Sequence, residues 1–143
     1  MRKSIILTFW ALIGVFLFII SQFFIPAIRE LMSGSIIFLL PLFIFFLLGI
    51  ILVFLTLKQR VSETLKKFLI LTGISAAGFF IFVLLHNFFY ALGIISSQIS
   101  ILSLMIGILQ TAFFITAIFI CPLGFIIGAI GTIVILIKKH SVL

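Results

Sequence analysis

The segment Lys66–Leu92 reads KKFLILTGISAAGFFIFVLLHNFFYAL and indicates the fold that the rest of the chain takes. After its two lysines it runs apolar for about 18 residues, close to the length that a helix needs to cross the hydrocarbon core of a bilayer. Shifted back by 64 residues, Arg2–Ile28 reads RKSIILTFWALIGVFLFIISQFFIPAI, and nine positions carry the same residue without a gap. The chain therefore contains an internal repeat of a membrane span.

The composition places the whole chain in a lipid environment. Of its 143 residues, 66% are hydrophobic and 8% are charged, which is more apolar surface than a water-soluble domain of this size can bury. The single cysteine, Cys121, excludes an internal disulfide framework and a cysteine-based metal cluster. The net charge of +7 does not indicate a nucleic-acid partner, because the positive residues flank the apolar segments. The sequence predicts an all-α membrane protein.

Four apolar segments are long enough to cross the membrane, and together they form one transmembrane domain over residues 1–143. They are Ser4–Ile25, Ile36–Leu57, Phe68–Leu92 and Ala112–Ile137. Eight lysines and arginines then lie on one side of the membrane and only Arg29 lies on the other, which predicts a cell-membrane protein with both termini in the cytoplasm. The eight are Arg2, Lys3, Lys58, Arg60, Lys66, Lys67, Lys138 and Lys139.

The second and fourth spans also repeat, so the four transmembrane helices are expected to form two tandem, parallel hairpins. Both spans contain Pro-Leu, then a glycine, then a basic end, at an offset of 81 residues instead of 64. The first copy is residues 2–60, and the second is residues 66–140 with an insertion at 93–111. We expect the insertion to form an extra apolar helix between spans three and four, which is interfacial, re-entrant or packed in the bundle. The run 99–137 is expected to be too long for one helix. We nevertheless reject a split into two spans after Pro122, because the last span would have only about 15 residues, too few to cross the membrane.

One face of the fourth span carries only small residues. They recur at helical spacing and include a GxxxG pair; they are Ala117, Cys121, Gly124, Gly128 and Gly131. Small residues let two helix backbones approach closely, which is how helices associate in lipid. We expect this face to pack against a neighbouring span of the same chain; the alternative is a homodimer interface.

Polar residues within the membrane form a candidate site around His86. Asn87 follows it, Tyr90 lies one turn further along, and Gln22 occupies the equivalent position in the first copy. Polar side chains at this depth usually hydrogen-bond to neighbouring helices, so we expect His86 to form an interhelical hydrogen bond, with Gln22 as a suitable partner, or to act with Tyr90 as an anchor at the membrane interface. The alternatives are a haem or metal ligand, a proton relay or a substrate contact. The only other histidine, His140, lies in the opposite tail, so no haem, other cofactor or metal is predicted.

The second half of the chain resembles uncharacterised small prokaryotic multi-pass membrane proteins. The resemblance rests on the pattern H-N-x-x-Y, here His86, Asn87 and Tyr90, followed by C-P-x-x-F-x-x-G-x-x-G. The second pattern is matched by Cys121, Pro122, Phe125, Gly128 and Gly131. The insertion at 93–111 departs from the short connection of that family, and the first half is not covered. The resemblance implies a prokaryotic origin and a membrane location, and it carries no known activity.

The sequence contains no set of residues typical of an enzyme. It has no aspartate, its glutamates Glu30 and Glu63 lie in loops, and it lacks common motifs for phosphoryl transfer and hydrolysis. We therefore expect a non-enzymatic accessory, assembly or immunity-type protein acting through helix–helix contacts. Its partners would be the lipid bilayer, a larger membrane protein or a second copy of itself. The alternative is an oligomeric channel or facilitator for a small solute, lined by Gln22, His86, Asn87 and the serines of the insertion.

Overall fold

The computed structural model describes residues 3–32, 36–95 and 100–140, and nearly all of them are helical. The elements are α1 (Lys3–Phe24), α2 (Pro26–Met32), the 3₁₀ turn η1 (Ile36–Leu39), α3 (Leu40–Lys58), α4 (Glu63–Ile95), α5 (Ser100–Ile115), the π-helical turn η2 (Thr116–Ile120) and α6 (Cys121–His140). Four helical segments of the described chain are long and apolar enough to cross a membrane: Lys3–Phe24, Ile37–Lys58, Glu63–Ile95 and Ser100–Lys138. This confirms the prediction of an all-helical chain with four membrane-length helices.

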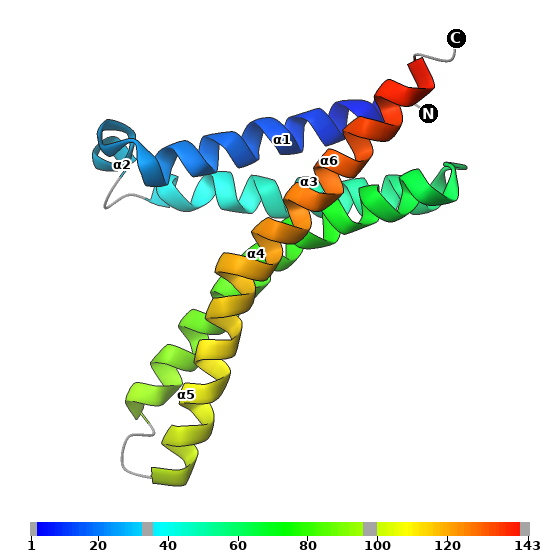
Figure 1. The fold of residues 1–143 in the computed structure, drawn as a ribbon. Helices are drawn as coiled ribbons and strands as arrows, with labels where there is room; N and C mark the ends of the chain where they lie inside the picture. Colours follow the sequence, from blue (N-terminus) through cyan, green and yellow to red (C-terminus); the bar gives the residue numbers. More distant parts are fainter. Residues whose placement is uncertain (1–2, 33–35, 96–99, 141–143) are drawn as a thin grey trace.

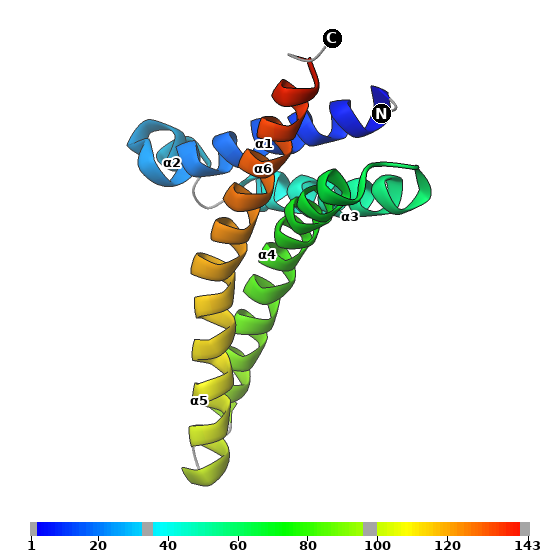
Figure 2. The ribbon, with the colours of Figure 1, turned by 45° about the vertical axis from the view of Figure 1, so that its right-hand side comes forward.

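The helices form two antiparallel pairs. The first pair is α1 with α3, the second is α4 with the rod of α5 and α6, and α3 contacts α4 to join the two pairs. α1 lies along α3, α3 lies along the first half of α4, and α6 lies against α4 on another side (Figure 1). The beginning of α1, the α3–α4 connection and the end of α6 gather at one end of the molecule (Figures 1 and 2). We call this the basic end, because its described residues include Lys3, Lys58, Arg60, Lys66, Lys67 and Lys138.

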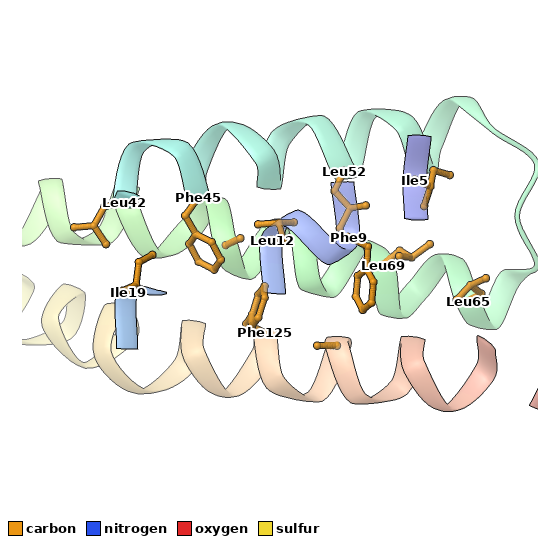
Figure 3. Close-up of a cluster of buried hydrophobic side chains, with 12 residues drawn as sticks. Ile5, Phe9, Leu12, Ile19, Leu42, Phe45, Leu52, Leu65, Leu69 and Phe125 are labelled. Carbon is orange, nitrogen blue, oxygen red and sulfur yellow. The ribbon is translucent and has the colours of Figure 1, made fainter. Parts of the chain in front are cut away.

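The core lies where all four long helices meet. Its fully buried residues recur along α1 at helical spacing, as Ile5, Phe9 and Leu12, and face Leu52 of α3 and Leu69 of α4 (Figure 3). Phe125 brings α6 into this core. Its ring centroid lies 4.5 Å from that of Phe16 and 5.1 Å from that of Phe45. Interlocked aromatic rings therefore fill the centre of the bundle.

The second pair of helices extends far beyond the first. Past Ile81, α4 diverges from α3 and continues with α5 packed alongside it, away from α1 and α3 (Figures 1 and 2). Aromatic contacts of Phe113 with Phe82 and Phe89 join the two helices there, with centroids 6.0 and 5.3 Å apart. We call residues 82–95 of α4 together with α5 the arm.

The arm corrects the prediction for the insertion at 93–111. No separate helix lies between spans three and four in the described chain; residues 93–95 end α4, and residues 100–111 belong to α5, which continues through η2 into α6 as one rod. The expectation that 99–137 is too long for one helix was therefore wrong for the described residues, because no charged residue interrupts the run from Ser100 to Ile137. Part of the predicted insertion, residues 96–99, lies outside the described residues. Some 17 residues added at the tip of a hairpin lengthen each helix by about 12 Å.

The π-helical turn in this rod has a local cause. Pro122 has no amide hydrogen, and in an α-helix its ring would clash with the carbonyl group four residues earlier. Just before it, the Cys121 amide donates to the Thr116 carbonyl, five residues back. The extra residue in this turn lets the rod continue through the proline. η2 also marks the junction between the arm and the four-helix body.

Candidate functional site

The small-residue face of α6 lies against α4 of the same chain. A Cβ atom placed on Gly128 would lie 2.8 Å from the Thr72 amide nitrogen and 2.9 Å from the Phe68 carbonyl oxygen. One placed on Gly124 would lie 2.5 Å from the Ser75 hydroxyl. These distances leave no room for any side chain, so the two backbones are in direct contact.

The remaining members of the predicted face join the same contact. Ala117 and Cys121 are buried, a Cβ on Gly78 of α4 would lie 3.4 Å from the Cys121 sulfur, and one on Gly131 would collide with the ring of Phe68. The whole face is thus occupied within the chain. A homodimer interface would need a different surface.

A second backbone contact, between α3 and α4, is absent from the sequence-based predictions. A Cβ on Gly49 would lie 2.7 Å from the Gly73 carbonyl oxygen, and one on Gly73 would lie 2.8 Å from the Gly49 carbonyl oxygen. Each glycine is the only one at this contact on its helix, so neither forms a periodic stripe. The signal available in the sequence was a glycine in the middle of each span, which costs helix stability unless close packing requires it.

His86 lies in the arm, where it bonds to α5. Its Nδ1 atom is 3.1 Å from the Gln110 carbonyl oxygen, and its ring centroid is 5.2 Å from that of Phe114. Since a carbonyl can only accept, Nδ1 carries the hydrogen and donates it. The hydrogen-bond partner of His86 is therefore Gln110 and not the expected Gln22. The repeat relationship fails here because α4 has diverged from the first helix pair by this point.

The other polar residues predicted around His86 do not converge with it. Gln22 is buried in α1, only 1% exposed, and Tyr90 is 55% exposed on the arm. Asn87 is exposed and donates to the Val83 carbonyl oxygen of its own helix at 3.0 Å. The candidate residues Gln22, His86, Asn87 and Tyr90 thus occupy separate surroundings.

The outward face of α5 carries a shallow groove of about 880 Å³ with polar and apolar residues in its lining. Ser100, Ser103, Gly107 and Thr111 line it between apolar side chains, and the Thr111 hydroxyl donates to the Gly107 carbonyl oxygen. A Cβ on Gly107 would meet no atom within 4 Å. This surface resembles the α6 face in the small size of its side chains, but no helix of the described chain covers it.

The described residues contain no group of three histidine, cysteine or acidic side chains that could hold a metal ion. Comparison with protein-family models, with curated proteins and with solved structures finds no match to this chain. The resemblance to small prokaryotic membrane proteins therefore stays a prediction.

Proposed function

We propose that this chain is a non-enzymatic membrane protein, of the accessory, assembly or immunity type, whose arm binds a transmembrane helix of another membrane protein. The observation that carries the proposal is the arm itself. It is a pair of helices that α1 and α3 leave uncovered, with a groove on its outer face that contains the small residues Ser103, Gly107 and Thr111.

The length of the two helical rods that form the arm at one end supports a protein partner. As helices, residues 68–95 rise about 42 Å and residues 100–137 about 57 Å, against a hydrocarbon core of about 30 Å. Fitting them by tilt alone needs angles of about 45° and about 60°, beyond the usual range of roughly 0–40°. No residue from 68 to 137 is Asp, Glu, Lys or Arg, so water is a poor environment for the excess length. A partner's apolar surface would provide a suitable one.

The groove supports a helix as the bound element. Ser103, Gly107 and Thr111 follow one another at steps of four, the small-xxx-small spacing through which membrane helices approach closely. The same kind of face on α6 already holds α4 in backbone contact. A partner helix would pack on α5 in the same way, through close contact between the two helix backbones.

The alternative of a channel receives less support from the described contacts. Its lining would have to combine Gln22, His86 and Asn87 with the α5 serines, and these side chains lie in separate surroundings. The centre of the four-helix body is filled by the rings of Phe16, Phe45 and Phe125.

Photo-crosslinking in native membranes tests the proposal. A benzophenone amino acid at Ile108, beside the groove, should give one discrete adduct, and Gly107→Leu should abolish it. Gly14→Leu is the matched control, because a Cβ at either glycine meets no atom within 4 Å. It should leave the adduct intact.

The mass of the adduct decides between the partners. An adduct other than a dimer of the 16.0 kDa chain supports an accessory role. Absence of any protein adduct would overturn the proposal. A dimer would replace it with self-association, and a solute-flux assay in proteoliposomes would then test the channel alternative.

A further inference from the structure

An apolar groove runs between α3 and α4 on the surface of the four-helix body. It has a volume of about 390 Å³ and is lined by Val53, Phe54 and Leu57 of α3 and by Ile74, Gly78 and Ile81 of α4. Gly78 has no side chain, and its Cβ direction points toward Cys121 of α6, so it lines the groove only with backbone atoms. The walls offer a hydrocarbon chain continuous apolar contact and offer it no hydrogen bond.

Two lysines lie toward the basic end of this groove. Lys58 directly follows Leu57, and its Nζ atom is 5.8 Å from the ring centroid of Phe54, a side chain of the groove wall. On α4, Lys67 is exposed and precedes Ile74 by seven residues, so the two lie on the same helix face. The apolar groove is thus continued on both helices by positive charge.

A second groove in the same body shows that this combination is not general. It lies between α1 and α3, has a volume of about 380 Å³ and is lined by residues that include Gly14, Phe18 and Ile44. It lies toward the other end of the body, where the charged residues of α2 are Arg29 and Glu30, of opposite sign. The two grooves match in size and apolar lining and differ in the charge beside them.

We propose that the α3–α4 groove is a binding site for an anionic glycerophospholipid. One acyl chain lies along Phe54, Ile74 and Gly78, and the phosphate group is bound by the ammonium groups of Lys58 and Lys67. An ammonium is a compact point charge that attracts phosphate, and lysines close to an anionic lipid surface add measurably to binding. A zwitterionic lipid fills the groove equally well and loses the net charge attraction.

Tryptophan quenching by brominated lipids tests this site. Trp10→Phe removes the only tryptophan of the chain, and Phe54→Trp then places a reporter in the groove wall. We expect brominated phosphatidylglycerol to quench this reporter with an apparent affinity about fivefold or more above that of brominated phosphatidylcholine. Lys58→Gln with Lys67→Gln should reduce the ratio to that of the controls.

Two controls separate the site from bulk lipid. Leu7→Trp lies one helical turn from Lys3, as Phe54 does from Lys58, at the same basic end but outside the groove. Phe18→Trp lies in the uncharged groove. Both should show similar quenching by the two lipids, with or without the lysine substitutions.

Equal lipid preference at Phe54 and Leu7 would overturn the proposal, because it would reflect only the charge of the basic end. A preference at Phe54 that survives the double lysine substitution would overturn it as well. Should Phe54→Trp not fold, Leu57→Trp is a second reporter in the same groove.

Discussion

At the scale of single residues, the described glycines differ in what surrounds them, and two kinds stand at the extremes. Gly49, Gly73 and Gly128 sit where two helix backbones touch, whereas Gly14 and Gly107 face open space. The distinction is invisible in any one glycine's sequence context, because it depends on the neighbouring helix. Substitutions at the two kinds of glycine are therefore expected to change the free energy of unfolding differently.

Gly128→Ala should lower the free energy of unfolding by about 1–3 kcal/mol, because the added methyl group meets the Thr72 and Phe68 backbone. Gly14→Ala is the control; it should be neutral or slightly stabilising, since alanine is the better helix former. Denaturant unfolding in detergent micelles measures both. Equal stabilities of the two variants would show that the α4–α6 contact is not as close as described.

His86→Leu should destabilise the arm by roughly 1 kcal/mol, the usual scale for a hydrogen bond between membrane helices. His86→Gln should restore most of that loss, because a glutamine amide can also donate to the Gln110 carbonyl oxygen. Thermal unfolding in detergent provides the comparison, with the exposed Asn87→Leu as control. A His86→Leu protein as stable as wild type would show that the His86–Gln110 hydrogen bond does not stabilise the arm.

At the scale of elements, α5 is the one whose position follows least from the sequence. The run from Ser100 to Ile137 contains no charged residue, so composition alone allows a short interfacial helix followed by a span, or one continuous rod. In the structure it is one rod, and α5 lies along α4 where a Cβ on Gly93 would be 3.5 Å from Cγ2 of Ile106.

The packing of the arm can be tested with a disulfide. In a Cys121→Ser background, the pair Gly93→Cys and Ile106→Cys should oxidise readily within one chain, because a Cβ on Gly93 would lie 3.5 Å from Cγ2 of Ile106. Protection from a polyethylene-glycol maleimide measures the bond. Gly93→Cys with Gly107→Cys is the control and should stay reactive. Full reactivity of the first pair would contradict the pairing of α4 with α5.

The sequence was sufficient for the number of membrane-length helices and for the small-residue face of α6, because both are periodic and local. It was insufficient for the Gly49–Gly73 contact, which is set by the height at which α3 crosses α4. The partner of His86 was also missed. That partner depends on how the residues at 93–111 shift α5 along α4, and the first copy of the repeat contains no equivalent of them.

At the scale of the whole molecule, the described lysines and Arg60 gather at the basic end, and the arm extends away from that end (Figure 1). A membrane protein of this shape is expected to keep its basic end in the cytoplasm. The arm then extends toward the outer side of the bilayer.

Cysteine labelling in intact cells tests this orientation. In a Cys121→Ser background, Ser141→Cys should resist a membrane-impermeant maleimide until the cells are opened. Ser97→Cys, between α4 and α5, should be the more accessible position from outside. Labelling of position 141 in intact cells would reverse the orientation and contradict the positive-inside assignment.

The backbone contacts on two sides of α4 have a consequence for the order in which the protein is made. α1 and α3 leave the ribosome first, yet the glycine contact that seats α3 needs Gly73, and the contact that seats α6 needs Thr72. The first two spans must therefore wait in the bilayer, or beside the insertion machinery, until α4 arrives. α6 completes the body only at the end of synthesis, so a chain truncated before α6 should leave one side of α4 exposed to the quality-control proteases of the membrane.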